Sequence, residues 1–305
     1  MKILITGISG FLGSAIAENL LKNGELVCGI IRSNSDLWRC KGFADQLKLI
    51  NIENENWEAN CILFEPDLII HSAWNGVTSN KRNDWNTQLS NLNLSIKLLH
   101  IAKTCNVDKF ISFGSQAEYG LFDGEVDESY KINPNSAYGL SKKYLQETIE
   151  CYCNQNGIKW YWLRLFSFFG EKEANTWLIP LLIKNVIEEK EMKMTPGDQK
   201  YAYMYIDDLA MIISKIAKSS NIKSGIYNIS SNNLISLKEL ANLIINCINP
   251  ETNNILFGAL PYRENQPMLI KGNIEKLEGQ IGKLKESDFK KNLNQVINFY
   301  LKNVK

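Results

Sequence analysis

A glycine-rich turn near the N-terminus constrains the fold more than any other feature of the chain. Residues 7–13 read Gly-Ile-Ser-Gly-Phe-Leu-Gly, with three glycines spaced three residues apart. The turn follows an apolar run at 2–6 and precedes residues 11–23, where apolar side chains recur at helical spacing. In such a unit the helix N-terminus attracts a pyrophosphate, and the glycines permit its close approach. With a second apolar run at 26–31, the pattern predicts a βαβ unit that binds a dinucleotide.

The alternation of apolar runs and helical patterns continues through the first half of the chain. Further strands are expected at 47–50, 68–70, 110–113 and 160–166, and the clearest helices at 87–104 and 138–153. This order predicts an α/β protein with a Rossmann-type, doubly wound parallel sheet that is covered by helices on both faces.

From about residue 170 the regular alternation of strand and helix patterns ends. Helices are expected near 176–190, 206–218, 236–248 and 287–302, separated by loops and short strands, and 224–229 again resembles a core strand. We therefore predict a dinucleotide-binding domain at 1–168, to which residues 203–230 return. A smaller, interleaved lobe at 169–305 is expected to bind mainly the substrate.

Composition excludes several classes of partner. Lys and Arg number 34 against 33 Asp and Glu, so no basic excess indicates nucleic acid. No apolar run approaches the length of a membrane span, and none resembles a signal peptide. The seven cysteines form no Cys-x-x-Cys pair, and there are only two histidines, so we expect free thiols, no metal site and a cytoplasmic location.

The end of the second strand bears on the choice of cofactor. An acidic residue there would bind the ribose hydroxyls of NAD. This strand ends in Arg32 and Ser33, which could instead bind a 2′-phosphate through charge-assisted hydrogen bonds. We predict NADP(H) in preference to NAD(H), with Arg32 as a merely solvated charge being the alternative.

Three residues form a candidate catalytic group. Tyr138 and Lys142 are four residues apart, which places them on one face of the helix expected at 138–153. A neighbouring ammonium stabilises a phenolate, so Lys142 is expected to lower the pKa of Tyr138 from about 10 and make it a usable acid or base. Ser115 follows the strand at 110–113 and could donate to a substrate carbonyl oxygen.

These features together resemble the extended short-chain dehydrogenase/reductase family of nucleotide-sugar epimerases, dehydratases and reductases. The resemblance covers nearly the whole chain. It rests on the glycine turn, residues 67–73, Asn91, Ser115, Tyr138 with Lys142, Arg164, and the segments 205–208, 227–229 and 261–263.

The resemblance implies roles for individual residues. Tyr138 would protonate the alkoxide oxygen, Lys142 would hold the nicotinamide ribose, and Ser115 would bind the reacting oxygen. Cofactor contacts are expected from Gly7, Ser9, Gly10, Phe11, Leu12, Gly13, Arg32, Ser33, Asn51, Ile52, His71, Ser72, Ala73, Asn91, Tyr138, Lys142, Phe166 and Phe168. Substrate contacts are expected from Trp74, Ser115, Gln116, Glu118, Ser167, Tyr201 and Arg263.

Departures from the family's patterns narrow the reaction. The 4,6-dehydratases carry Asp-Glu after the catalytic Ser or Thr, whereas this chain has Gln116 and Ala117, which cannot exchange protons in that way. Ala117 also replaces the Cys of double epimerases. The prediction is NADPH-dependent reduction of the C4 keto group of a nucleotide-linked 4-keto-6-deoxyhexose, in the synthesis of surface-polysaccharide sugars.

Two alternatives stay open. One is a nucleotide-sugar 4-epimerase that retains NAD, because epimerases share the Ser, Tyr and Lys. The other is a non-catalytic dinucleotide-binding regulator or scaffold, although such relatives often lose the Tyr or the Lys. The resemblance also implies a homodimer through the helices near 91–104 and 138–153.

Overall fold

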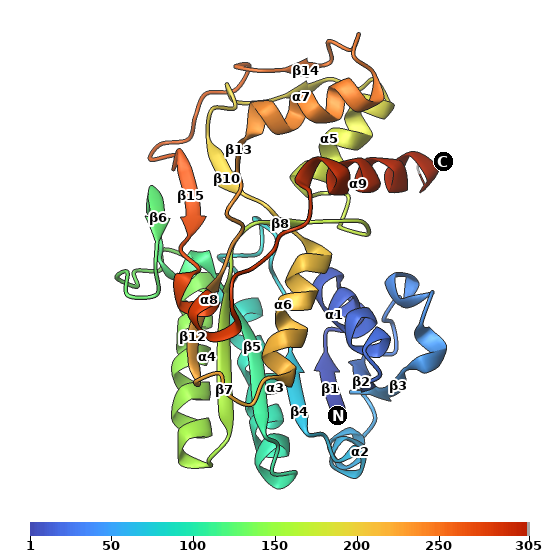
Figure 1. Cartoon of the computed structure of the whole chain (residues 1–305), viewed down its shortest axis with the longest axis vertical. Coiled ribbons are helices and arrows are strands. Elements are labelled where there is room, and N and C mark those ends of the chain that lie inside the picture. The colour runs from blue at the N-terminus through green and yellow to red at the C-terminus, as the bar shows by residue number, and fades with distance from the viewer. Residues whose placement is uncertain (304–305) are drawn as a thin grey trace.

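A seven-stranded parallel sheet organises the chain in a computed structural model that describes residues 1–303 (Figure 1). The strand order reverses between the first strand in the chain, Lys2–Thr6, and the fourth, Leu68–His71. In open α/β sheets, ligands bind at such a switch point, beyond the carboxyl ends of the strands. From edge to edge the strands are β12 (Gly225–Ile229), β7 (Lys159–Leu165), β5 (Lys109–Ser115), β4 (Leu68–His71), β1 (Lys2–Thr6), β2 (Leu26–Ile31) and β3 (Lys48–Asn51).

Helices cover both faces of this sheet. Helices α1 (Phe11–Lys22) and α6 (Ile206–Lys218) lie together on one face, and α2 (Trp57–Phe64), α3 (Trp85–Thr104) and α4 (Ala137–Gln155) on the other.

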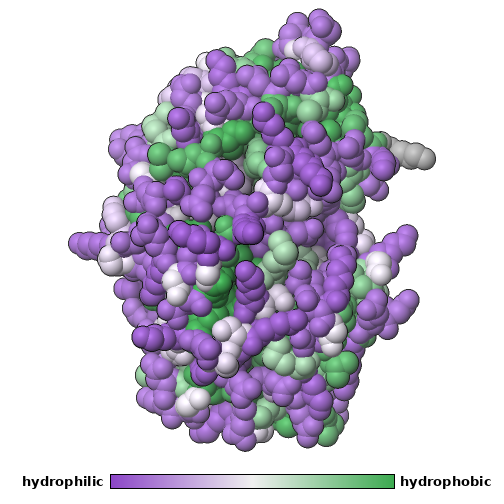
Figure 2. All heavy atoms as spheres, viewed as in Figure 1, coloured by the Kyte–Doolittle hydropathy of each residue, from purple (hydrophilic) through white to green (hydrophobic). Residues whose placement is uncertain are grey.

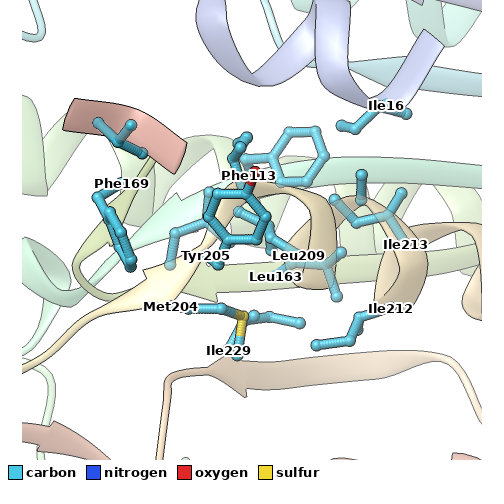
Figure 3. Packing of buried hydrophobic residues seen from close by; sticks show 14 of the residues in the cluster. Ile16, Phe113, Leu163, Phe169, Met204, Tyr205, Leu209, Ile212, Ile213 and Ile229 are labelled. Carbon is cyan, nitrogen blue, oxygen red and sulfur yellow. The ribbon is translucent and has the colours of Figure 1, made fainter. Parts of the chain in front are cut away.

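Alternation along β1 explains why both faces need cover. Ile3 and Ile5 pack into one buried cluster, to which α1 and α6 contribute Ile16 and Leu209 (Figure 3), and Leu4 packs into the second cluster on the opposite face. A strand that is buried on both sides reads as a continuous apolar run, as observed at 2–6.

Much of the C-terminal part forms a second layer beyond the carboxyl ends of the strands (Figure 1). A four-stranded sheet here includes a strand from the first half of the chain, which ties the two parts together. Its order is β13 (Leu234–Ser236), β10 (Lys200–Ala202), β15 (Leu269–Gly272) and β6 (Gly124–Val126). The other α-helices are α5 (Leu178–Ile187), α7 (Leu237–Ile248), α8 (Glu275–Ile281) and α9 (Phe289–Asn303). Two further strand pairs are β8 (Phe168–Phe169) with β11 (Met204–Tyr205) and β9 (Met192–Lys193) with β14 (Ile255–Leu256).

The structure confirms the predicted fold class. The strands expected at 47–50 and 160–166 are each shifted by one residue, to Lys48–Asn51 and Lys159–Leu165. The helix expected at 176–190 is shorter, because α5 begins only after Trp177 and ends at Ile187. Helix α2 was not singled out in the sequence, because its eight residues carry no clear apolar stripe.

The view in Figure 2 shows a mostly hydrophilic face on which apolar side chains gather in separate patches. No helix within residues 1–303 has the length and apolar character needed to cross a membrane.

Candidate active site

A cavity of about 390 Å³ opens at the carboxyl ends of β1, β5 and β7. It brings together the glycine turn, the end of β5, the start of α4 and the segment that follows β7. The predicted site residues that line it are Gly7, Gly10, Phe11, Leu12, Gly13, Ser72, Trp74, Ser115, Gln116, Tyr138, Lys142, Phe166, Ser167 and Phe168.

The backbone of the glycine turn approaches its surroundings too closely for side chains. Gly7 has φ +70°, and a Cβ there would lie 2.7 Å from the backbone nitrogen of Ala73. A Cβ on Gly13 would lie 2.2 Å from the Gly7 carbonyl oxygen. No side chain caps α1 at Gly10, so its N-terminus faces the cavity as a potential anion site. This cradle fits the pyrophosphate of a dinucleotide.

We expect Gly13→Ala to distort this cradle. The added methyl group would overlap backbone atoms of Gly7, and such overpacking costs about 1–3 kcal/mol. Urea unfolding should show this loss, and isothermal titration should show weaker binding of the dinucleotide. The matched control is Gly279→Ala in α8, where a Cβ meets nothing within 4 Å. A Gly13→Ala protein as stable as the wild type, with unchanged affinity, would contradict the assignment.

Local structure positions the three catalytic candidates. Ser115 ends β5 and caps a 3₁₀ turn at Gln116–Glu118, and the Ser136 hydroxyl accepts from the Gly139 amide at 3.1 Å to cap α4. Tyr138 and Lys142 then lie one helical turn apart, facing the cavity. The Lys142 ammonium donates to the Phe113 carbonyl at 2.7 Å.

The electrostatics differ from the sequence-based expectation. Burial raises the pKa of Tyr138, while the Arg82 cation and the Ser115 hydroxyl act in the opposite direction. Lys142 does not lower it in this structure. Burial instead lowers the pKa of Lys142 itself to about 7, and the Glu118 charge opposes this. The spacing of four residues therefore places the pair correctly, but does not report how deeply the lysine is buried.

The structure does not place Glu118, which was predicted to contact substrate, in the cavity lining. Its side chain is fully buried and forms an ion pair with Arg164 at 2.8 Å. The same carboxylate accepts from the Ser115 amide at 2.8 Å and from the Trp162 indole at 3.1 Å. Glu118 therefore stabilises the 3₁₀ turn that follows Ser115, and it does not line the cavity.

Tyr201 and Arg263 also lie outside the cavity lining. The Tyr201 hydroxyl accepts from the Gln266 amide at 3.3 Å, and Arg263 is exposed in the loop before β15. Tyr203, two residues further along, lines the cavity instead.

Several predicted cofactor contacts do not line the cavity. His71 is buried between the hydroxyls of Thr6 and Ser95, at 2.7 and 2.8 Å, and burial lowers its pKa to about 3. Asn91 accepts from the Asn75 amide at 2.7 Å and so fixes the loop after β4. The others outside the lining are Ser9, Arg32, Ser33, Asn51, Ile52 and Ala73.

The ends of β2 and β3 hold the residues predicted to select the cofactor. Arg32 is exposed and donates to the Asn75 side chain at 2.8 Å. Ser33 accepts from Asn51 at 2.8 Å, and its amide lies 3.3 Å from a Glu53 carboxylate oxygen. The Glu53 carboxylate thus approaches the end of β2. Because Glu53 follows β3, the sequence at the end of β2 does not indicate this carboxylate.

Sequence reasoning missed ten residues of the lining. Four of them are Arg82, Glu173, Trp177 and Tyr203, and the other six are Val77, Phe113, Gly114, Leu165, Leu178 and Ile179. The Arg82 guanidinium lies 5.1 Å from the centroid of the Tyr138 ring. One carboxylate oxygen of Glu173 and the Gln116 side-chain oxygen are buried without a hydrogen-bond partner among residues 1–303. Burial raises the pKa of Glu173 to about 8. Both groups therefore retain hydrogen-bonding capacity for a ligand.

This fold and site correspond to a known family. Residues 3–230 match the model of the NAD dependent epimerase/dehydratase family, and the chain belongs to that family. The resemblance to extended short-chain dehydrogenases/reductases is thereby confirmed.

Two named relatives match most of the chain. It is 27% identical over 270 residues to a CDP-abequose synthase from Yersinia pseudotuberculosis, covering 88% of this chain and 91% of the relative. It is 25% identical over 250 residues to a dTDP-6-deoxy-L-talose 4-dehydrogenase (NAD(+)) from Aggregatibacter actinomycetemcomitans, covering 78% and 87%.

Among solved structures, a UDP-glucose 4-epimerase from Thermotoga maritima has a TM-score of 0.88 at 18% identity, with both chains fully covered. A dTDP-glucose 4,6-dehydratase from Streptomyces venezuelae, with NAD bound, has a TM-score of 0.85 at 19% identity, covering 99% of this chain and 98% of the other. At these identities the likeness establishes the fold alone.

Proposed function

We propose that this enzyme uses NADPH to reduce the C4 keto group of a nucleotide-linked 4-keto-6-deoxyhexose. The observation that carries the proposal is the pair Gln116–Ala117 directly after Ser115, beside the complete set of Ser115, Tyr138 and Lys142. With Glu118 bound to Arg164, this turn presents no carboxylate to a sugar. It therefore lacks the base that dehydration requires and retains the groups that carbonyl reduction requires.

The names of two relatives support a C4 redox reaction on a deoxysugar. The Aggregatibacter protein is a 4-dehydrogenase of a dTDP-6-deoxy sugar, and oxidation at C4 is the reverse of C4 keto reduction. The Yersinia protein is a synthase of a CDP-linked sugar. Nucleotide sugars are thus the substrate class that we propose for this cavity.

In the proposed reaction, a bound nicotinamide would supply the hydride, and side chains of the protein would position the keto oxygen and supply the proton. The Ser115 hydroxyl donates to the keto oxygen and fixes its position. The Tyr138 hydroxyl transfers its proton to the same oxygen as negative charge develops there, which is the usual role of a positioned general acid. The Lys142 ammonium would hold the nicotinamide ribose, and the Arg82 cation beside the Tyr138 ring favours the resulting phenolate.

The test is NADPH oxidation with dTDP-, CDP-, GDP- and UDP-linked 4-keto-6-deoxyhexoses, with the products identified by NMR. Conversion of the keto sugar to one C4 alcohol with stoichiometric NADPH loss is the expected result. The 4-epimerase alternative predicts instead that purified protein carries tightly bound NAD and interconverts C4 alcohols without net oxidation of added cofactor. Folded protein that is inactive in both assays would overturn the proposal.

The cofactor preference rests on Arg32, and we expect Arg32→Asp to reverse it. Loss of a charge-assisted hydrogen bond to the 2′-phosphate, worth about 1.5–3 kcal/mol, should weaken NADPH binding by about 10- to 100-fold while NADH binding is kept or improved. Fluorescence titration with each nucleotide measures this without any substrate. Glu53→Gln is the control, because removing this nearby carboxylate should favour NADPH. An unchanged NADPH-to-NADH ratio in Arg32→Asp would contradict the assignment.

We also propose that the chain forms a homodimer through α3 and α4. Leu89 and Ile96 on α3 are each 45% exposed, and Tyr144 on α4 is 48% exposed. Apolar groups gathered on two adjacent helices favour an interface. Light scattering should give twice the chain mass, and replacing Leu89 and Ile96 together by Lys should give the monomer.

A further inference from the structure

Trp74 lies against the catalytic lysine. It follows β4 in the chain, and its indole centroid is 3.6 Å from the Lys142 ammonium nitrogen. The ring also meets Tyr138 edge to face, at 6.2 Å between centroids and 85° between planes. One side chain from outside α4 therefore contacts both members of the pair.

Lys142 has few other groups to stabilise its charge. Its side chain is 5% exposed, and its single hydrogen bond among residues 1–303 goes to the Phe113 carbonyl. A buried ammonium without compensating partners is strongly disfavoured relative to the neutral amine. The face of an indole attracts a cation, and this attraction is largest where water is excluded.

The Trp74 ring is held in place by a buried amide. Its indole N–H donates to the Gln88 side-chain oxygen at 2.8 Å. Gln88 is fully buried on α3, and its own amide donates to the Gly76 and Lys81 carbonyls at 2.8 and 3.0 Å. The ring therefore cannot turn away from Lys142 without breaking this network.

We propose that Trp74 is a positioning residue that keeps the Lys142 ammonium charged and directed into the cavity by a cation–π contact. The proposal rests on the role proposed for Lys142, but not on the identity of the sugar or the direction of the reaction. This role differs from the predicted contact of Trp74 with substrate.

The other groups that face Lys142 do not account for its stabilisation. His71 on β4 is neutral, because burial and the lysine itself lower its pKa to about 3. The Glu118 charge favours the ammonium, but this carboxylate is paired with Arg164. The Trp162 ring on β7 is more distant, at 5.9 Å from the nitrogen, and Tyr138 lies at the same distance.

The test follows the protonation of Lys142 directly, in protein without substrate. Protein labelled with 13C-lysine is titrated by NMR, and the Cε signal of Lys142 is identified by its absence in Lys142→Met. Trp74→Leu should lower the pKa of Lys142 by about one unit, a tenfold change in its acid dissociation constant. Trp74→Phe, which keeps a weaker aromatic face, should fall between Leu and the wild type.

A second measurement leaves the shape of the site unchanged. Growth on 5-fluorotryptophan weakens the π face of every indole, and the pKa of Lys142 should fall in the wild-type sequence. It should fall far less in Trp74→Phe, where Trp162 is the only indole near Lys142 among residues 1–303. This comparison stays informative if Trp74→Leu does not fold.

Two results would overturn the proposal. One is an unchanged Lys142 pKa in a folded Trp74→Leu protein. The other is a fluorotryptophan effect of equal size with and without Trp74. If a substrate is identified, the loss of kcat at high pH should also begin at a lower pH in Trp74→Leu. A change confined to KM would instead assign Trp74 to substrate contact. Because the titration needs no turnover, its failure is distinguishable from failure of the proposed reaction.

Discussion

Tyr138→Phe should lower kcat by about 10²- to 10⁴-fold, the usual contribution of a positioned general acid. The hydroxyl that is removed lines the cavity beside Ser115, and no other phenol from the described part of α4 faces this space. Phe preserves the ring that Trp74 meets edge to face and that Arg82 covers. The loss should therefore be chemical, with stability and dinucleotide affinity unchanged.

The measurement is single-turnover NADPH oxidation, with cofactor affinity determined separately by fluorescence. Tyr144→Phe is the matched control, because it removes a phenolic hydroxyl from the same helix at a position outside the cavity lining. Its rate should equal that of the wild type. A Tyr138→Phe enzyme that retains most of its activity would move the proton donor to another group, of which Glu173 is the only carboxyl among the described lining residues.

Local patterns in the sequence predicted the parts of the site that depend on local geometry. The backbone of the glycine turn is determined by one strand, the turn itself and the helix that follows. The placement of Tyr138 and Lys142 on one face follows from the helical repeat. The structural role of Glu118 is also indicated by a local sequence pattern. Ser115-x-x-Glu118 is a capping box, which commits that carboxylate to the Ser115 amide.

The remaining parts of the site depend on packing between distant segments. Arg82, Glu173 and Tyr203 reach the cavity from loops that no periodicity describes. The contact of Trp74 with Lys142 joins residues on opposite sides of β5 in the sequence. The low pKa of Lys142 arises from burial, which spacing along one helix does not reveal.

Glu118→Leu should produce the largest loss of stability, about 3–5 kcal/mol, because it leaves a buried charge without its partner. Arg164 is 1% exposed, and its guanidinium has the Glu118 carboxylate on one side and the Tyr119 hydroxyl at 3.2 Å on the other. The same substitution frees the Ser115 amide, so the catalytic serine should also shift. Urea unfolding measures the first effect, and kcat measures the second.

Adding Arg164→Met to Glu118→Leu tests whether the uncompensated charge causes that loss. If it does, the double variant should be more stable than the sum of the two single losses predicts, by a coupling energy of about 0.5–3 kcal/mol. The Ser115 amide and the Trp162 indole would still lack their acceptor, so recovery of stability should be incomplete and kcat should stay low. Strict additivity would mean that Glu118 acts through these two hydrogen bonds and not through its charge. The ion pair would then add nothing to stability beyond the separate contributions of Glu118 and Arg164.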